Sequence, residues 1–370
     1  MGKALLVIAA VELALLLTVS APTNPDKPGV DGGFRTAAAL LRGDGPPVDL
    51  VQDYEGARSL VRGGDSYEVL TRAYAQVGLR WPAEHRSTHP PTAFLLVLPV
   101  SWLSWRAASA VWAALMLAAI AASWWALGAR WELAAALAPP TLLWPPAAWS
   151  LGQLTPLWLL GLALAWRWRG LPARAGAATA LAALTKLLPA LALVPFLVLR
   201  RLRVVVGFAV VAGGALLVLL ALRPGVVSRY VSVVRATGDD QAARGENSSL
   251  LWAFDHRFGA AGVAVAAVLV LVVVARSIVR LRGRAGLDEW SWWAWAWAGV
   301  ALLPIAWVYS QLPLLPALAY CARRGGVVSH GLAGFAVSVP FLIDPFGLPG
   351  GIRLACGTVC VGLALLATRE

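Results

Sequence analysis

Residues 204–222, VVVGFAVVAGGALLVLLAL, form an uncharged apolar run of membrane-spanning length. As a helix the run would rise about 28 Å, close to the ~30 Å hydrocarbon thickness of a bilayer. Similar runs recur along the chain, in which 59% of the 370 residues are hydrophobic and the mean hydropathy is +0.70. The runs are continuous rather than alternating, which favours helices over a barrel. We therefore expect an all-α polytopic transmembrane bundle with about 10–12 membrane segments.

The basic residues indicate how the segments are oriented. The net charge is +12, but the arginines cluster between apolar runs, as in the pair Arg200-Arg201. This is the pattern of positive-inside topology rather than of nucleic-acid binding, so we expect no nucleic-acid partner. The pattern predicts a multi-pass protein of the cell membrane, with both termini cytoplasmic. We expect one integral membrane domain, residues 1–370, with external loops at 21–90 and 223–258.

Further apolar segments follow the same pattern along the chain. We expect a first span at residues 1–20, and further segments at 107–127, 154–166, 259–275, 290–303, 312–322, 327–343 and 352–367. Residues 131–149 contain four prolines and predict broken half-helices that line a cavity. The tryptophans of residues 290–297 are typical of an anchor belt at the membrane interface.

Residues 46–67, PPVDLVQDYEGARSLVRGGDSY, are the most acidic part of this basic chain. Leu50, Tyr54, Ala57 and Val61 fall on one stripe, which predicts a short amphipathic helix in the first external loop, as does the spacing of residues 34–41. Such carboxylates are often only solvated, and Asp49 also suits a helix N-cap.

Lys186 and Pro189 interrupt the apolar stretch 175–199 near its middle. An ammonium deep in hydrocarbon costs at least about 2.5–3.5 kcal/mol, so Lys186 should face an anion or a watery cavity. The arginines on both sides of the stretch favour a bent pair with Lys186 near its tip. The alternative is one long helix whose lysine snorkels or pairs with an acid.

The sequence lacks the motifs of several common enzyme classes. Walker, dinucleotide, zinc and nucleophile-elbow motifs do not occur, and the three cysteines suggest neither a disulfide framework nor a metal site. Carboxylates, an intramembrane lysine and external arginines suit a different reaction. In it a carboxylate takes a proton from an acceptor hydroxyl, while cations hold a phosphate leaving group.

Short motifs are spread over residues 45–325. In chain order they are DLVQDYEGA (49–57) with GGDSY (63–67), HPP (89–91) with Pro99, GQ (152–153), LTKLLP (184–189) with Arg200-Arg201, NSSL (247–250) and LPIAWVY (303–309). This series resembles glycosyltransferase family 87, a family of GT-C-class membrane mannosyltransferases that use polyprenyl-phosphate mannose. The order and spacing of the motifs together carry the resemblance.

The resemblance implies a hexosyltransferase that moves mannose or another hexose from a polyprenyl-phosphate donor to a lipid or glycan acceptor at the outer membrane face. It makes Asp49 the candidate general base, with Asp53 one helical turn along the same face as the second candidate. The implied phosphate ligands are Lys186, Arg229 and Arg244. The implied pocket residues are Tyr54, His89, Gln153, Asn247 and Tyr309. The resemblance implies no cofactor and no metal.

Two positions depart from the family pattern: Tyr309-Ser310 stands where some members carry histidines, and Leu303 stands where a serine is common. A purely structural role is the alternative for three of these residues. His89 precedes two prolines and would then only shape the entry of the chain into the membrane. Gln153 and Tyr309 would then only form hydrogen bonds between helices of the bundle. The competing classes are a transporter or lipid-linked sugar flippase, which would fit the broken helices, and a structural membrane subunit.

Overall fold

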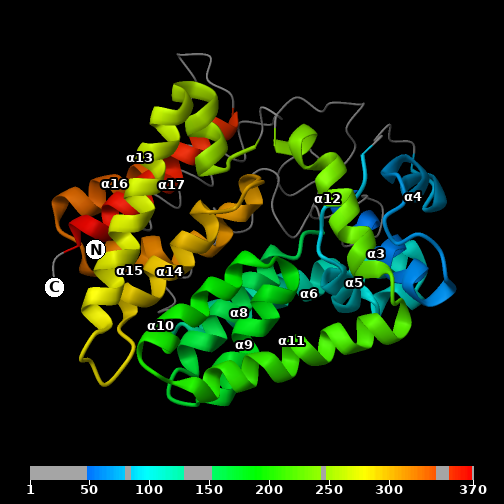
Figure 1. The fold of residues 1–370 in the computed structure, drawn as a ribbon, viewed down its shortest axis with the longest axis horizontal. Helices are drawn as coiled ribbons and strands as arrows, with labels where there is room; N and C mark the ends of the chain where they lie inside the picture. The colour runs from blue at the N-terminus through cyan, green and yellow to red at the C-terminus, as the bar shows by residue number, and fades with distance from the viewer. Residues whose placement is uncertain (1–47, 80–84, 129–151, 243–246, 339–349, 369–370) are drawn as a thin grey trace. The chain divides into compact units, whose positions relative to one another are not determined.

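The structure is a computed structural model that describes residues 48–79, 85–128, 152–242, 247–338 and 350–368. Every regular element in these ranges is a helix, which confirms the all-α prediction (Figure 1). The α-helices are α3 (Val48–Arg62), α4 (Leu70–Gln76), α5 (Pro91–Val97), α6 (Trp105–Ala126), α8 (Thr155–Arg167), α9 (Pro172–Thr185), α10 (Val194–Val198), α11 (Leu202–Leu222), α12 (Val226–Ala242), α13 (Leu250–Leu281), α14 (Glu289–Ala301), α15 (Leu315–Arg324), α16 (Val327–Ser338) and α17 (Gly350–Ala367). The 3-10 helices are η1 (Val100–Trp102), η2 (Leu188–Leu193) and η3 (Val308–Leu314).

Three of the described helices, α6, α11 and α13, are long and apolar enough to cross a membrane by length and composition. Three shorter apolar helices span Leu188–Val198, Val327–Ala336 and Ile352–Ala367. The predicted start of a segment at residue 259 coincides with Gly259, whose φ of 61° kinks the longer helix α13. The segments predicted at 1–20 and 131–149, and the helix at 34–41, lie outside the described residues.

Contacts divide the chain into two compact units. Unit 1 comprises residues 1–161, 180–187 and 209–239; unit 2 comprises residues 162–179, 188–208 and 240–370. The helices α8, α9, α11 and α12 each contribute residues to both units.

Unit 1 is built around α3, which contacts α4, α5 and η1. A carboxylate, Asp49, lies in its first turn and Arg62 in its last, as the helix dipole favours. Gly63 ends the helix with φ of 88°, and its N–H donates to the carbonyl of Ser59 at 3.0 Å. The helix predicted from the apolar stripe is therefore confirmed. Its polar side is also largely buried: Asp53 is 0% exposed and Glu55 7%.

An apolar cluster in unit 1 joins α3 to α5, α11 and α12. Its buried members are Ala57, Leu60, Tyr67, Phe94, Leu219, Val226 and Val233. The helix α12 lies inside the segment 223–258 that we expected as an external loop. Its residues Val226 and Val233 are seven apart, two helical turns on one face, and this face packs into the cluster.

The apolar stretch around Lys186 is broken, as the sequence predicted. The helix α9 ends at Thr185, Lys186 and Leu187 are not helical, and η2 starts at Leu188. The alternative of one long helix is excluded. Thr92 at the start of α5 donates a hydrogen bond to the carbonyl of Leu184 at 2.8 Å, which fixes the chain just before the lysine.

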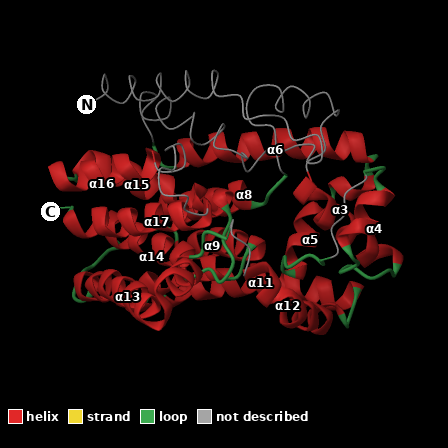
Figure 2. Ribbon diagram, turned by 90° about the horizontal axis from the view of Figure 1, so that it is seen from above, coloured by secondary structure: helices red, strands yellow, loops and turns green. Residues whose placement is uncertain are grey.

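Unit 2 has α14 at its core. The helices α13, α14 and α17 run side by side (Figure 2), and nearly every residue of α14 is buried. Its tryptophans Trp290, Trp292, Trp293, Trp295 and Trp297 are 0–6% exposed. The prediction of an interfacial anchor belt was therefore wrong, because hydropathy does not distinguish a helix facing lipid from one enclosed by protein.

A close helix crossing in unit 2 depends on two glycines. A Cβ on Gly176 of α9 would lie 1.9 Å from the carbonyl oxygen of Val204 of α11. A Cβ on Gly207 would lie 2.1 Å from the carbonyl oxygen of Ala173. The backbones therefore touch, as small residues allow between membrane helices.

Candidate active site

The two aspartates of α3 lie one turn apart on one face, and each is held by a different neighbour. The side-chain amide of Gln153 donates to Asp49 Oδ2 at 2.6 Å. The Nδ1 of His89 lies 2.9 Å and 3.0 Å from the two carboxylate oxygens of Asp53. The predicted residues Asp49, Asp53, His89 and Gln153 thus come together in unit 1, from segments far apart in sequence.

Local structure places Gln153. It follows Gly152, whose φ of 77° favours glycine, and it precedes the first turn of α8. The indole N–H of Trp112 in α6 donates to the Gly152 carbonyl at 2.9 Å. The amide that reaches Asp49 is therefore anchored through its neighbour.

The pair of Asp53 and His89 is equally well supported. Asp53 is 0% exposed, so its charge needs a partner. A carboxylate can only accept, so Nδ1 carries the proton and Nε2 is left with a lone pair unless the ring is protonated. The hydroxyl of Tyr67 donates to the His89 carbonyl at 3.0 Å, and the His89 N–H donates to Ser87 Oγ at 3.2 Å. These two bonds hold the backbone of His89, and the contacts of Nδ1 with Asp53 orient the ring.

The electrostatic setting of Asp49 suits a proton acceptor. Burial raises the pKa of its carboxyl above the ordinary value. The Gln153 hydrogen bond is the next largest influence and lowers it, as do the charges of His89 and, more weakly, Lys186, without cancelling the effect of burial. Asp49 is thus a stronger base than an exposed carboxylate, with a lysine close enough to influence its charge.

Two tyrosines near this cluster were not among the predicted site residues. Tyr74 of α4 is buried, and Asp49 contributes to the rise of its pKa, which burial dominates. Tyr67 supports His89 as described above. Tyr67 belongs to the quoted GGDSY motif, whereas a lone Tyr74 on a seven-residue helix gave no signal.

Tyr54, predicted to line the pocket, is a buried structural contact in this structure. Its hydroxyl donates to the carbonyl of Leu103 at 2.8 Å, and its ring meets Trp105 edge to face at 5.2 Å. Arg58 stacks over the same ring, 5.2 Å from its centroid.

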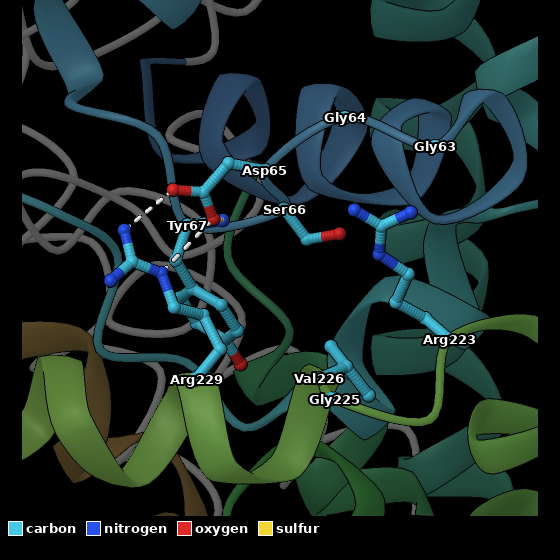
Figure 3. A pocket seen from close by; sticks show the side chains of 9 residues that line it. All are labelled: Gly63, Gly64, Asp65, Ser66, Tyr67, Arg223, Gly225, Val226 and Arg229. Carbon is cyan, nitrogen blue, oxygen red and sulfur yellow. Dashed lines mark hydrogen bonds and ion pairs between the residues drawn. The ribbon is translucent and has the colours of Figure 1, made fainter.

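Arg229 lies in a second polar group centred on Asp65. Its Nη2 and Nε contact the Asp65 oxygens at 2.5 Å and 3.2 Å (Figure 3). Arg86 Nη1 lies 3.2 Å from Asp65 Oδ2. Burial raises the pKa of Asp65, but the Arg229 hydrogen bond, the Tyr67 N–H and both arginine charges lower it below the ordinary value overall. A phosphate bound by Arg229 would share the guanidinium with Asp65.

Two of the remaining predicted residues belong to unit 2, and one lies outside the described residues. Asn247 belongs to unit 2, where its Oδ1 accepts from the N–H groups of Ser249 and Ala306, both at 3.0 Å. Tyr309 lies in η3 of the same unit, partly exposed. Arg244 lies outside the described residues. For these three the predicted roles stay predictions.

The described residues offer no group of three or more His, Cys, Asp or Glu side chains that could hold a metal ion. The polar atoms of the cluster are instead a carboxylate, a carboxylate–imidazole pair, an amide and an ammonium group. Such a set can accept a proton and bind an anion.

Residues 88–262 match the model of glycosyltransferase family 87. The match confirms the resemblance seen in the motifs, and it includes His89, Gln153, Lys186 and Asn247. The family 87 match, which covers less than half of the chain, and the apolar helices together support a membrane glycosyltransferase. Searches of curated proteins and of solved structures each found no match.

Proposed function

We propose that the chain transfers a hexose from a polyprenyl-phosphate donor to a lipid or glycan acceptor at the outer face of the cell membrane. Mannose is the hexose that we propose. The observation that supports this proposal best is the setting of Asp49. Its carboxylate is half-buried, has a raised pKa and is held by Gln153. The charge of Lys186 influences it, so the site provides both a base and a cation.

In the proposed reaction Asp49 takes the proton of an acceptor hydroxyl. The hydroxyl oxygen then forms a bond to the anomeric carbon of the sugar, and the bond between that carbon and the phosphate oxygen breaks. The bonding electrons leave with the polyprenyl phosphate, whose increased negative charge Lys186 stabilises. The proton passes from Asp49 to water once the products leave.

Asp53 and His89 act as a positioning pair in this proposal. Both carboxylate oxygens of Asp53 already contact the ring, at 2.9 and 3.0 Å, and the residue is 0% exposed, which limits the access of an acceptor hydroxyl. Asp49 has one amide contact and keeps acceptor capacity on its second oxygen. This difference favours Asp49 as the base.

The test is sugar transfer by the purified protein in nanodiscs, with polyprenyl-phosphate mannose and membrane lipid acceptors. Asp49→Asn should lower kcat by about 10²–10⁴-fold, the usual contribution of a general base. Lys186→Met should also lower kcat. The matched carboxylate control is Asp239→Asn, exposed on α12, which should leave the rate unchanged.

The outcomes separate the candidate functions. Loss on Asp53→Asn with full activity in Asp49→Asn would move the base to Asp53. If the wild type transfers none of several lipid-linked sugars but moves such a lipid between leaflets, the flippase alternative replaces the transferase.

A further inference from the structure

A pocket in unit 1 lies beside the Asp65 group and is not part of the Asp49 cluster. Its volume is about 370 Å³, within the size range of small-ligand sites. The lining residues are Gly63, Gly64, Asp65, Ser66, Tyr67, Arg223, Gly225, Val226 and Arg229 (Figure 3). They come from the turn after α3 and from the junction of α11 and α12.

Ser66 supplies a hydrogen-bonding group that the protein does not use. The residue is 8% exposed, and its Oγ is buried without a hydrogen-bond partner. Figure 3 shows the hydroxyl directed into the pocket, on the side of Arg223. A buried hydroxyl without a partner costs free energy, so its retention points to a ligand that accepts its proton.

Arg223 supplies the charge. In the described part of the chain its guanidinium makes no ion pair or side-chain hydrogen bond, whereas Arg229 is engaged by Asp65. Its Nη1 would lie 3.6 Å from a Cβ built on Gly63, so it extends across the turn that carries Ser66. Two arginines and one aspartate at the lining leave a net positive charge.

The helix α12 also favours an anionic ligand in this pocket. It has 17 residues and begins at Val226, so the positive end of its dipole lies at the pocket wall. Gly63, Gly64 and Gly225 keep side chains away from this wall, and Gly63 has φ of 88°, where another residue would be strained. A guanidinium, a hydroxyl and a helix N-terminus are together the groups that bind phosphate.

The position of Arg223 indicates where that phosphate comes from. Arg223 directly follows Leu222, the last residue of the apolar helix α11, which is long enough to span a bilayer. Residues at the end of a span lie at the depth of the lipid headgroups. We propose that this pocket binds the phosphate group of a membrane lipid through Arg223 and Ser66. The proposal does not depend on the sugar-transfer reaction.

The experiment measures lipid binding to the full-length protein, purified and delipidated in detergent, without any sugar donor. The probes are dioctanoyl phosphatidic acid, dioctanoylglycerol of the same chain length, and inorganic phosphate. We expect phosphatidic acid to bind and to raise the unfolding temperature. Dioctanoylglycerol, which lacks the phosphate, should bind at least about ten-fold more weakly, and inorganic phosphate should also bind weakly.

Variants separate a built site from an arginine that merely extends into the headgroup layer. Arg223→Gln should weaken phosphatidic acid binding by about 10–100-fold, the effect of losing a charged hydrogen bond. Ser66→Ala should weaken it by about 10-fold while leaving the unfolding temperature of the lipid-free protein equal or higher, because it removes a hydroxyl without a partner. The matched control is Arg235→Gln, exposed on α12, which should bind as wild type.

Three results would overturn the proposal. Equal affinity for phosphatidic acid and dioctanoylglycerol would show that the phosphate is not recognised. Wild-type binding by Ser66→Ala would show that Arg223 acts without the pocket. Inorganic phosphate binding as tightly as phosphatidic acid would make the site one for a soluble anion.

Discussion

Removing the imidazole of His89 tests the buried pair on α3 directly. In His89→Ala the Asp53 carboxylate, 0% exposed, loses a partner 2.9 and 3.0 Å from its two oxygens. Leaving a buried charge without its partner costs about 3–5 kcal/mol. Because the His89 side chain is 11% exposed and water can partly replace it, we expect a loss of about 3 kcal/mol.

The assay is reversible denaturation in detergent, followed by circular dichroism. Asp53→Asn keeps a neutral hydrogen bond to the ring and should cost only about 1–2 kcal/mol. The double variant Asp53→Ala, His89→Ala removes both partners. It should be more stable than the sum of the single changes predicts, with a coupling of about 1–3 kcal/mol.

The control for this series is His256→Ala, an exposed histidine of α13 that stacks on Trp252. It should change the free energy of unfolding by less than about 1 kcal/mol. If His89→Ala unfolds like His256→Ala, or if the double-variant coupling is zero, the reasoning about the pair is wrong.

Two further predictions concern backbone packing and proton transfer. Gly176→Ala should destabilise unit 2 by more than the ~1–3 kcal/mol of ordinary overpacking, since the added Cβ meets backbone. The control Gly213→Ala, on open α11 surface in unit 1, should stabilise the protein slightly; thermal unfolding compares the two variants, and equal melting would refute the close crossing. Because burial raises the pKa of Asp49 above the ordinary aspartate value, the acid limb of kcat/KM against pH should lie at a higher pH than for an exposed aspartate. Gln153→Leu should move this limb higher still by removing a hydrogen bond to the carboxylate; an unmoved limb would contradict the base assignment.

Local patterns in the sequence predicted the helices well. The apolar stripe around Tyr54 depends only on the helical repeat, and the helix it predicted at 50–61 is observed at 48–62. The break at Lys186 was also predictable, because a charge and a nearby proline disfavour a continuous apolar helix. These signals lie within a few residues of one another and need no knowledge of tertiary contacts.

Such local patterns could not predict contacts between residues far apart in the sequence. Asp65 and Arg229 are 164 residues apart, and neither position signals the other. The motifs predicted that Asp53 and His89 share a site, but not that they bind each other. The tryptophans of α14 were misread for the same reason, since their neighbours come from α17, about 60–75 residues later.

This last feature has a consequence for biogenesis. The indole groups of Trp290 and Trp297 donate to the carbonyls of Leu365 and Thr358 on α17, at 2.8 and 2.7 Å. The ribosome completes α14 well before it makes α17, so α14 waits in the translocon or lipid with these donors unsatisfied. Unit 2 therefore closes only after α17 emerges, and until then the tryptophan-rich helix is a natural target for membrane chaperones and quality-control proteases.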